Sequence, residues 1–195
     1  MENKFKLIID SFGKDRFKFD ESLKDYTALG VGGKAKLFFV AFSAQELVKI
    51  IDMSRQLNLP YFLFGSGSKI MISDQGFDGL VIKNRTKNIQ TVSVKGKVTK
   101  HGLGISEALI EVESGVSINM FIQVLQSQGL STQGFSLMQG SIGGNLFFSK
   151  LLQSMIKSIK VLDLNSQIDE IAVESLSPKK HVILSAVFRI KANQL

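Results

Sequence analysis

The segment Tyr61-Phe62-Leu63-Phe64-Gly65-Ser66-Gly67-Ser68 joins four apolar residues to four very small ones. The apolar run predicts a buried strand, because a short continuous apolar stretch bounded by glycine is typical of one. Residues without side-chain bulk after a strand allow backbone N–H groups to surround a phosphate closely. A second cluster, Gly140-Ser141-Ile142-Gly143-Gly144, also adjoins an apolar element. Two such clusters predict a diphosphate-bearing ligand held from both sides.

The sequence around the first cluster predicts the order strand, helix, strand. The first strand is expected over residues 36–42, and the helix after it begins at Ser43, with Glu46 in the capping-box position. Pro60 ends this helix, because the residue before a proline avoids helical geometry. Another strand is expected near residues 80–83. This order predicts a parallel pair of strands joined by a right-handed crossover.

Beyond Lys83 the pattern becomes rich in strands, with one helix that begins at Ser117 and is closed by Gly129. The chain is therefore predicted to be an α+β domain of two lobes, residues 1–86 and 87–195. A ligand that touches both glycine clusters is expected in the crevice between these lobes. The strands expected in the second lobe are residues 91–95 and 97–100, which form a hairpin about Gly96, residues 108–113, the hairpin of 158–164 and 168–173, and residues 182–190.

The composition of the 195 residues restricts the chemistry. There is no cysteine, which excludes disulfides, thiolate metal sites and cysteine nucleophiles. Neither a signal peptide nor an apolar run of membrane-spanning length is present, so we expect a cytoplasmic protein without a membrane partner. The net charge of +7 favours anionic partners.

A basic run extends from Lys83 to Ser106 without a carboxylate. It fits either a solvated hairpin face or an electrostatic guide for a nucleotide or an acidic partner. Nucleic acid is disfavoured as the partner, because no aromatic residues for base stacking are interleaved with the lysines.

The usual catalytic sets are missing. The two histidines, His101 and His181, lie far apart in sequence and lack the spacing of metal ligands. The glycine-serine segment lacks the Gly-Lys-Ser/Thr ending of a Walker A motif and the glycine spacing of a Rossmann fold. We therefore predict no catalytic residue and no metal ligand, and we interpret most of the phenylalanines as core.

The order of motifs resembles the FAD-binding part of the UDP-N-acetylenolpyruvoylglucosamine reductases, which are MurB-type enzymes of the PCMH-like FAD-binding superfamily. Residues 74–82, DQGFDGLVI, match the family's DEGFDGLVI almost letter for letter. Weaker matches cover residues 27–33 (TALGVGG against NTFGIGG), 65–71 (GSGSKIM against GGGSNLL), 114–116 (SGV against AGV), 137–144 (against GIPGTVGG) and the strand over 182–188.

This resemblance implies a two-lobed fold of the PCMH/MurB type, an oxidoreductase background and FAD as the cofactor. NADPH, a protein partner and a second copy of the chain are further candidate partners. The residues that the resemblance assigns to cofactor binding are Thr27, Gly30, Gly32, Gly65, Ser66, Gly67, Ser68, Lys69, Gly115, Gly140, Ser141, Ile142, Gly143, Gly144 and Asn145.

The departures from the family bear on activity. The family continues into a substrate domain that supplies a serine proton donor and a glutamate, and its Tyr-Arg-x-Ser motif is replaced here by residues 175–180, SLSPKK. Three hypotheses stay open. The chain is a flavoprotein that is not a competent reductase alone, a reductase of peptidoglycan precursor synthesis whose substrate domain comes from elsewhere, or a non-catalytic module that has lost FAD.

Overall fold

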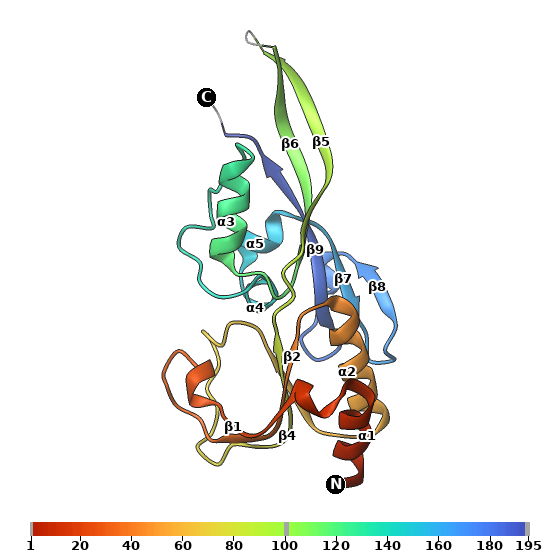
Figure 1. Ribbon diagram of the computed structural model, residues 1–195. Coiled ribbons are helices and arrows are strands. Elements are labelled where there is room, and N and C mark those ends of the chain that lie inside the picture. Colours follow the sequence, from red (N-terminus) through yellow and green to blue (C-terminus); the bar gives the residue numbers. More distant parts are fainter. Residues whose placement is uncertain (1, 100–101, 194–195) are drawn as a thin grey trace. The chain divides into compact units, whose positions relative to one another are not determined.

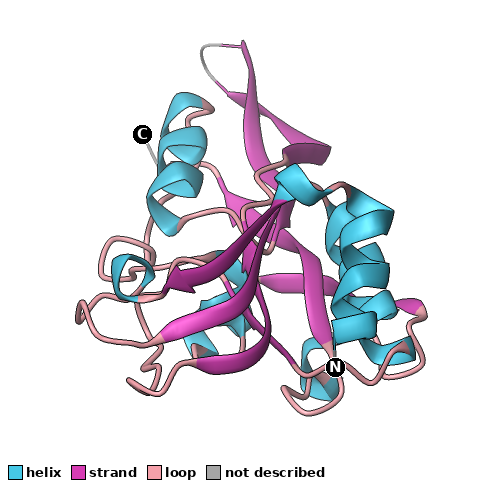
Figure 2. Cartoon of the chain, turned by 60° about the horizontal axis from the view of Figure 1, so that its bottom comes forward, coloured by secondary structure: helices cyan, strands magenta, loops and turns pink. Residues whose placement is uncertain are grey.

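The computed structural model describes residues 2–99 and 102–193 (Figure 1). The chain separates into two compact units, with the boundary between Thr86 and Lys87. Both units combine helices with a sheet, which confirms the predicted α+β class (Figure 2). Along the described residues, none of the helices is long and apolar enough to cross a membrane.

The first unit is built on a four-stranded sheet in the order β1-β2-β4-β3. β1 is antiparallel to β2, whereas β2 and β3 both run parallel to β4. The predicted parallel strands are therefore present, but β4 lies between them. The elements are α1 (Glu2–Phe12), η1 (Lys14–Arg16), β1 (Phe17–Ser22), η2 (Lys24–Tyr26), β2 (Lys34–Ala41), α2 (Ala44–Gln56), β3 (Tyr61–Phe64) and β4 (Phe77–Asn84).

The capping box at the start of α2 is confirmed. The Ser43 hydroxyl accepts from the Glu46 N–H at 3.2 Å, and the Glu46 carboxylate accepts from the N–H of Phe42, one residue before the cap. Buried Leu47, Ile50 and Ile51 lie at helical spacing on one face of α2. Local sequence thus sets both the beginning of this helix and the face that it buries.

Glu46 is also expected to make folding stability depend on pH. Its hydrogen bond from Arg16, at 2.7 Å, is the main cause that lowers the pKa of Glu46 below 4.5. A carboxylate with a lowered folded pKa stabilises the fold above its unfolded pKa, and this contribution is lost as the pH falls through the folded pKa. Glu46→Gln should cost about 1 kcal/mol at neutral pH.

Urea denaturation at several pH values tests this expectation. The difference in unfolding free energy between wild type and Glu46→Gln should shrink as the pH drops below 4.5. Glu170→Gln, an exposed glutamate of β8 in the second unit, is the control and should change little. A difference for Glu46→Gln that stays constant down to acid pH would contradict the argument.

The second unit is built on a five-stranded sheet in the order β5-β6-β9-β7-β8, with every neighbouring pair antiparallel. The predicted hairpin of β7 and β8 and the predicted final strand are present. The elements are β5 (Ile89–Thr99), β6 (Gly102–Glu113), α3 (Ile118–Ser127), α4 (Ile142–Leu146), α5 (Lys150–Ser154), β7 (Ile156–Leu162), β8 (Ile168–Ile171), η3 (Val173–Ser175) and β9 (Val182–Lys191).

The predicted hairpin about Gly96 is wrong. Gly96 lies inside β5, paired with Ile105 of β6, and the register shifts between Lys95 and Gly96. A glycine at an irregularity bends a strand without reversing it, which explains why the sequence signal was misleading. β5 and β6 run together as one long ribbon, green in Figure 1. Lys100 and His101, which connect these strands, lie outside the described residues.

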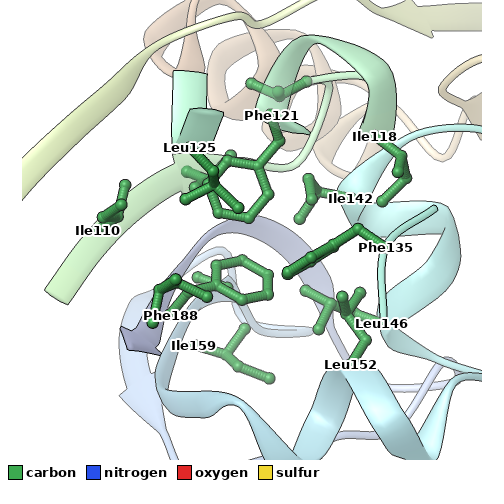
Figure 3. Packing of buried hydrophobic residues seen from close by; sticks show 14 of the residues in the cluster. Ile110, Ile118, Phe121, Leu125, Phe135, Ile142, Leu146, Leu152, Ile159 and Phe188 are labelled. Atoms are coloured by element: carbon green, nitrogen blue, oxygen red, sulfur yellow. The ribbon is translucent and has the colours of Figure 1, made fainter. Parts of the chain in front are cut away.

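The core of the second unit is centred on three phenylalanines from separate parts of the chain. Phe121 comes from α3, Phe188 from β9 and Phe135 from the segment between α3 and α4. Their rings point toward one another (Figure 3), with centroids 5.1 Å apart for Phe121–Phe188 and 5.3 Å for Phe121–Phe135. These side chains are core, as the sequence predicts.

Candidate functional site: two glycine-rich clusters

The first cluster, residues 65–68, follows the edge strand β3. The predicted strand is present as β3, but the prediction that it is buried is correct only for Phe64, since Tyr61, Phe62 and Leu63 are half-buried at the sheet edge. β3 runs parallel to β4, with Phe64 opposite Lys83. The 65–68 loop therefore leaves the sheet at the carboxyl ends of parallel strands, where open α/β sheets commonly bind ligands.

Gly67 holds this loop against the backbone of Tyr26. Its φ is 80°, and a Cβ added there would lie 1.8 Å from the Tyr26 carbonyl oxygen. The Gly67 carbonyl accepts from the N–H of Ala28 at 3.3 Å. The structure thus brings the 65–68 loop and the 27–33 loop together, as two loops assigned to one ligand require.

The 65–68 loop combines an exposed residue, Ser66, with a buried one, Gly67. In the part of the chain that the structure describes, the N–H groups of Ser66 and Gly67 donate to no protein acceptor. The hydroxyls of Ser66 and Ser68 lie 3.0 Å apart, and Lys69 follows them on the exposed side of the loop. Free N–H groups and hydroxyls in a tight loop are suitable donors to phosphate oxygens.

The 27–33 loop is shaped by its own side chains and glycines. The Thr27 hydroxyl donates to the Val31 carbonyl at 2.7 Å and accepts from the Val31 N–H at 3.2 Å. Gly30 and Gly32 have φ values of 63° and 137°, in the region that favours glycine. Thr27, Gly30 and Gly32 therefore determine the path of the loop that contacts the first cluster.

The second cluster, residues 140–145, packs on the turn at residues 114–116. The N–H of Ile142 donates to the Val116 carbonyl at 2.8 Å, and the N–H of Gly143 donates to the Ser114 carbonyl at 2.9 Å. A Cβ at Gly143 would lie 2.8 Å from the Cβ of Ser114, so this close approach requires glycine. The structure thus brings Gly115 and the 140–145 segment together within the second unit.

The second cluster uses part of its backbone donors for contacts within the protein. Ser141 caps α4, with its hydroxyl accepting from the Gly144 N–H at 3.3 Å. Together with the bonds of Ile142 and Gly143, this uses three N–H groups of the cluster, whereas those of Gly140 and Ser141 donate to no acceptor among the described residues. Gly140 has a φ of 98°, which completes the bend before the cap. The second cluster therefore presents a fixed backbone surface, and in the described part of the chain both clusters keep N–H groups without a protein acceptor.

Asn145 holds the second cluster in place and is buried, with 3 % of its surface exposed. Its amide nitrogen donates to the carbonyls of Gln139 at 2.9 Å and Ser141 at 2.8 Å. Asn145→Ala should lower the unfolding free energy by about 2 kcal/mol, because it leaves buried polar groups unsatisfied. Denaturant titration against Asn119→Ala, an exposed position on α3, measures this. Equal losses of unfolding free energy in the two variants would contradict the role of Asn145 in holding the second cluster in place.

Tyr26 and Ser114 were not among the predicted site residues, although Tyr26 precedes the 27–33 motif and Ser114 is the first residue of the 114–116 motif. Tyr26 supplies the carbonyl under Gly67, and Ser114 supplies the carbonyl under Gly143. In such a backbone contact the sequence shows only the glycine that permits the close approach. It does not show which residue supplies the carbonyl. His181 has a local structural role, since its Nδ1 accepts from the Ser177 N–H at 3.2 Å.

Each unit also contains a hollow. In the first unit, a hollow of about 550 Å³ is lined by residues that include Gly32, Lys24 and Asp74. In the second unit, a cavity of about 600 Å³ lies among Phe135, Met155 and neighbouring residues, and none of the predicted site residues lines it. Among the described residues, no group of three or more His, Asp or Glu side chains is placed to hold a metal ion.

Comparison with known proteins identifies what these clusters are similar to. A family model described as "FAD binding domain" matches residues 35–149. The UDP-N-acetylenolpyruvoylglucosamine reductase of Chlamydia abortus is 31 % identical over 186 residues, which cover 88 % of this chain and 58 % of that protein. The chain thus spans somewhat more than half the length of this curated relative.

Solved structures support the same fold. The UDP-N-acetylenolpyruvylglucosamine reductase (MurB) from Thermus caldophilus matches with a TM-score of 0.65 and 20 % identity, covering 91 % of this chain and 62 % of that one. p-Cresol methylhydroxylase matches with a TM-score of 0.64 and 13 % identity, covering 99 % and 44 %. At these identities the likeness concerns the fold alone, which is the two-lobed type expected from the motifs.

Proposed function

Since this chain belongs to the FAD binding domain family, we propose that its role is to hold FAD through the loops of its two glycine-rich clusters. The cofactor is FAD. The observation that carries the proposal is the 65–68 loop, where Gly67 lies too close to the Tyr26 carbonyl for a side chain and adjacent N–H groups have no protein acceptor among the described residues. Such a loop fits a phosphate group.

The proposed binding roles follow from the local geometry. Ser66 and Gly67 offer N–H donors to the diphosphate, with Gly65, Ser68 and Lys69 in the same loop. Thr27, Gly30 and Gly32 support that loop from the neighbouring segment. In the second unit the contact is made by a backbone surface held by Ser114 carbonyl contacts and by the Asn145 side chain. Its proposed members are Gly115, Gly140, Ser141, Ile142, Gly143, Gly144 and Asn145.

A second candidate is reduction of UDP-N-acetylenolpyruvoylglucosamine with NADPH as the electron donor. The name of the Chlamydia abortus relative favours it. FAD supplies hydride transfer in such chemistry. The resemblance assigns the proton donor and the substrate-binding groups to a domain that the 195 residues do not match. We therefore propose that these residues by themselves bind FAD without completing the reduction, and that a further polypeptide segment or partner would supply the rest.

The visible absorption spectrum of the purified chain, before and after FAD addition and gel filtration, tests FAD binding. Flavin bands that co-elute with the protein are expected. A chain that stays colourless with added FAD would overturn the proposal and leave the non-catalytic module. If flavin is retained, NADPH with and without the enolpyruvyl substrate tests the second candidate, and substrate-dependent NADPH oxidation by the chain alone would contradict our view that it does not complete the reduction.

A further inference from the structure

Lys83 lies beside the 65–68 loop at the carboxyl end of β4. It is half-buried, and its Nζ lies 4.8 Å from the ring centroid of Tyr26 and 5.0 Å from that of Phe64. The same two residues flank Gly67, whose added Cβ would meet the Tyr26 carbonyl and lie 3.7 Å from the Phe64 ring. The lysine cation and the glycine-serine loop therefore share the Tyr26–Phe64 pair.

Lys18 lies on the same aromatic cluster and, in contrast to Lys83, is paired with a carboxylate. Its Nζ donates to Glu21 at 2.6 Å and to the Tyr26 hydroxyl at 3.1 Å, and these two bonds raise the pKa of Lys18 to about 12. The Tyr26 hydroxyl in turn donates to Glu21 at 2.6 Å. Oε1 of Glu21 thus accepts from both Lys18 and Tyr26.

Lys83 has no such partner. Among the described residues Lys83 makes no ion pair or hydrogen bond with a carboxylate. The charged side chain close enough to affect its pKa is Arg85, which is also positive. Burial, followed by the charge of Arg85, lowers the pKa of Lys83. Two aromatic faces offset part of the cost of burying this cation. An anion next to Lys83 would offset the rest of this cost.

We propose that Lys83 pairs with a phosphoryl group of the bound flavin nucleotide and makes flavin binding depend on phosphate. The inference rests on the proposed function and adds a residue that the motifs do not include. A half-buried cation without a carboxylate lies at the carboxyl ends of β3 and β4, next to backbone N–H groups without acceptors. Together these provide the charge and the donors that phosphate recognition uses.

Titration of Lys83→Met with FAD and with riboflavin, which has no phosphate, tests the inference. FAD affinity should fall about tenfold or more, whereas riboflavin affinity should stay within about twofold. The salt dependence of FAD binding should also become weaker in Lys83→Met, because one phosphate contact is lost. If riboflavin binds too weakly to titrate, the salt dependence of FAD binding tests the inference by itself.

Two further variants separate charge from packing. Lys83→Arg keeps a cation and should retain most of the FAD affinity. Lys36→Met is the matched control, since Lys36 also lies over an aromatic ring, 5.7 Å from that of Phe5, but is paired with Asp78 at 3.3 Å. Its FAD affinity should equal that of wild type. Thermal melts of all variants establish that they are folded.

Unchanged FAD affinity and salt dependence in Lys83→Met would overturn the inference while leaving FAD binding intact. An equal loss of FAD and riboflavin affinity would also overturn it, because Lys83 would then act on the flavin ring or on loop packing. A wild-type chain that binds no FAD would refute the proposed function itself, and the inference with it.

Discussion

Gly67→Ala is expected to destabilise the first unit by about 3 kcal/mol or more and to abolish measurable FAD binding. A φ of 80° costs an alanine about 1–2 kcal/mol. Forcing extra volume into a packed site adds about 1–3 kcal/mol, and the new Cβ would lie 1.8 Å from the Tyr26 carbonyl oxygen. Because that atom is backbone, the 65–68 loop must move away from the 27–33 loop.

Gly129→Ala is the matched control for Gly67→Ala. Gly129 also has a positive φ, 68°, but an added Cβ would meet nothing within 4 Å. This variant should therefore show only the backbone strain of about 1–2 kcal/mol and keep its FAD affinity. Urea denaturation followed by circular dichroism gives the stabilities, and flavin retention on gel filtration gives binding. Equal stability loss in both variants would show that contact with Tyr26 is unimportant.

Phe188→Ala should destabilise the second unit by about 3–5 kcal/mol, the usual cost of removing a buried phenylalanine. Phe188 is 0 % exposed. Its ring lies 5.1 Å from that of Phe121 and 6.3 Å from that of Phe135. It also pairs with Ile110 across β6 and with Ile156 across β7. Removing it leaves a cavity at the point where α3, β6, β7 and β9 meet.

Phe148→Ala, at a side chain that is 75 % exposed, is the control for Phe188→Ala. Its unfolding free energy should stay within about 0.5 kcal/mol of wild type. Denaturant midpoints of the two variants make the comparison. A small effect of Phe188→Ala would mean that the aromatic cluster is not the centre of the core.

Much of the local structure could be predicted because its signals lie within a few residues. Ser43 and Glu46 form the cap of α2, and Ser117 caps α3 through the N–H of Met120. Gly129 follows α3 with the positive φ expected after a helix. Neighbouring residues gave a wrong prediction at Gly96, where a hairpin turn was expected. A glycine between two β-forming stretches indicates a turn and a strand irregularity equally well.

The tertiary contacts around the glycine clusters could not be predicted in this way. Sequence gave no indication that β4 lies between β2 and β3, or that the N–H groups of Ile142 and Gly143 are used by the 114–116 turn. Nor did it indicate which carbonyl lies under Gly67. Each of these depends on which distant segments meet, and nothing in the neighbouring residues records that.

The sequence by itself thus determined the α+β class, the starts of α2 and α3, the glycine-rich loops and the FAD-binding family, since local chemistry and short motifs encode them. Only the tertiary structure decided which N–H groups of each loop are used within the protein and that Lys83, rather than another lysine of the basic run, lies half-buried beside Tyr26 and Phe64. The physical reason is that burial and pairing are created by packing between residues far apart in the chain.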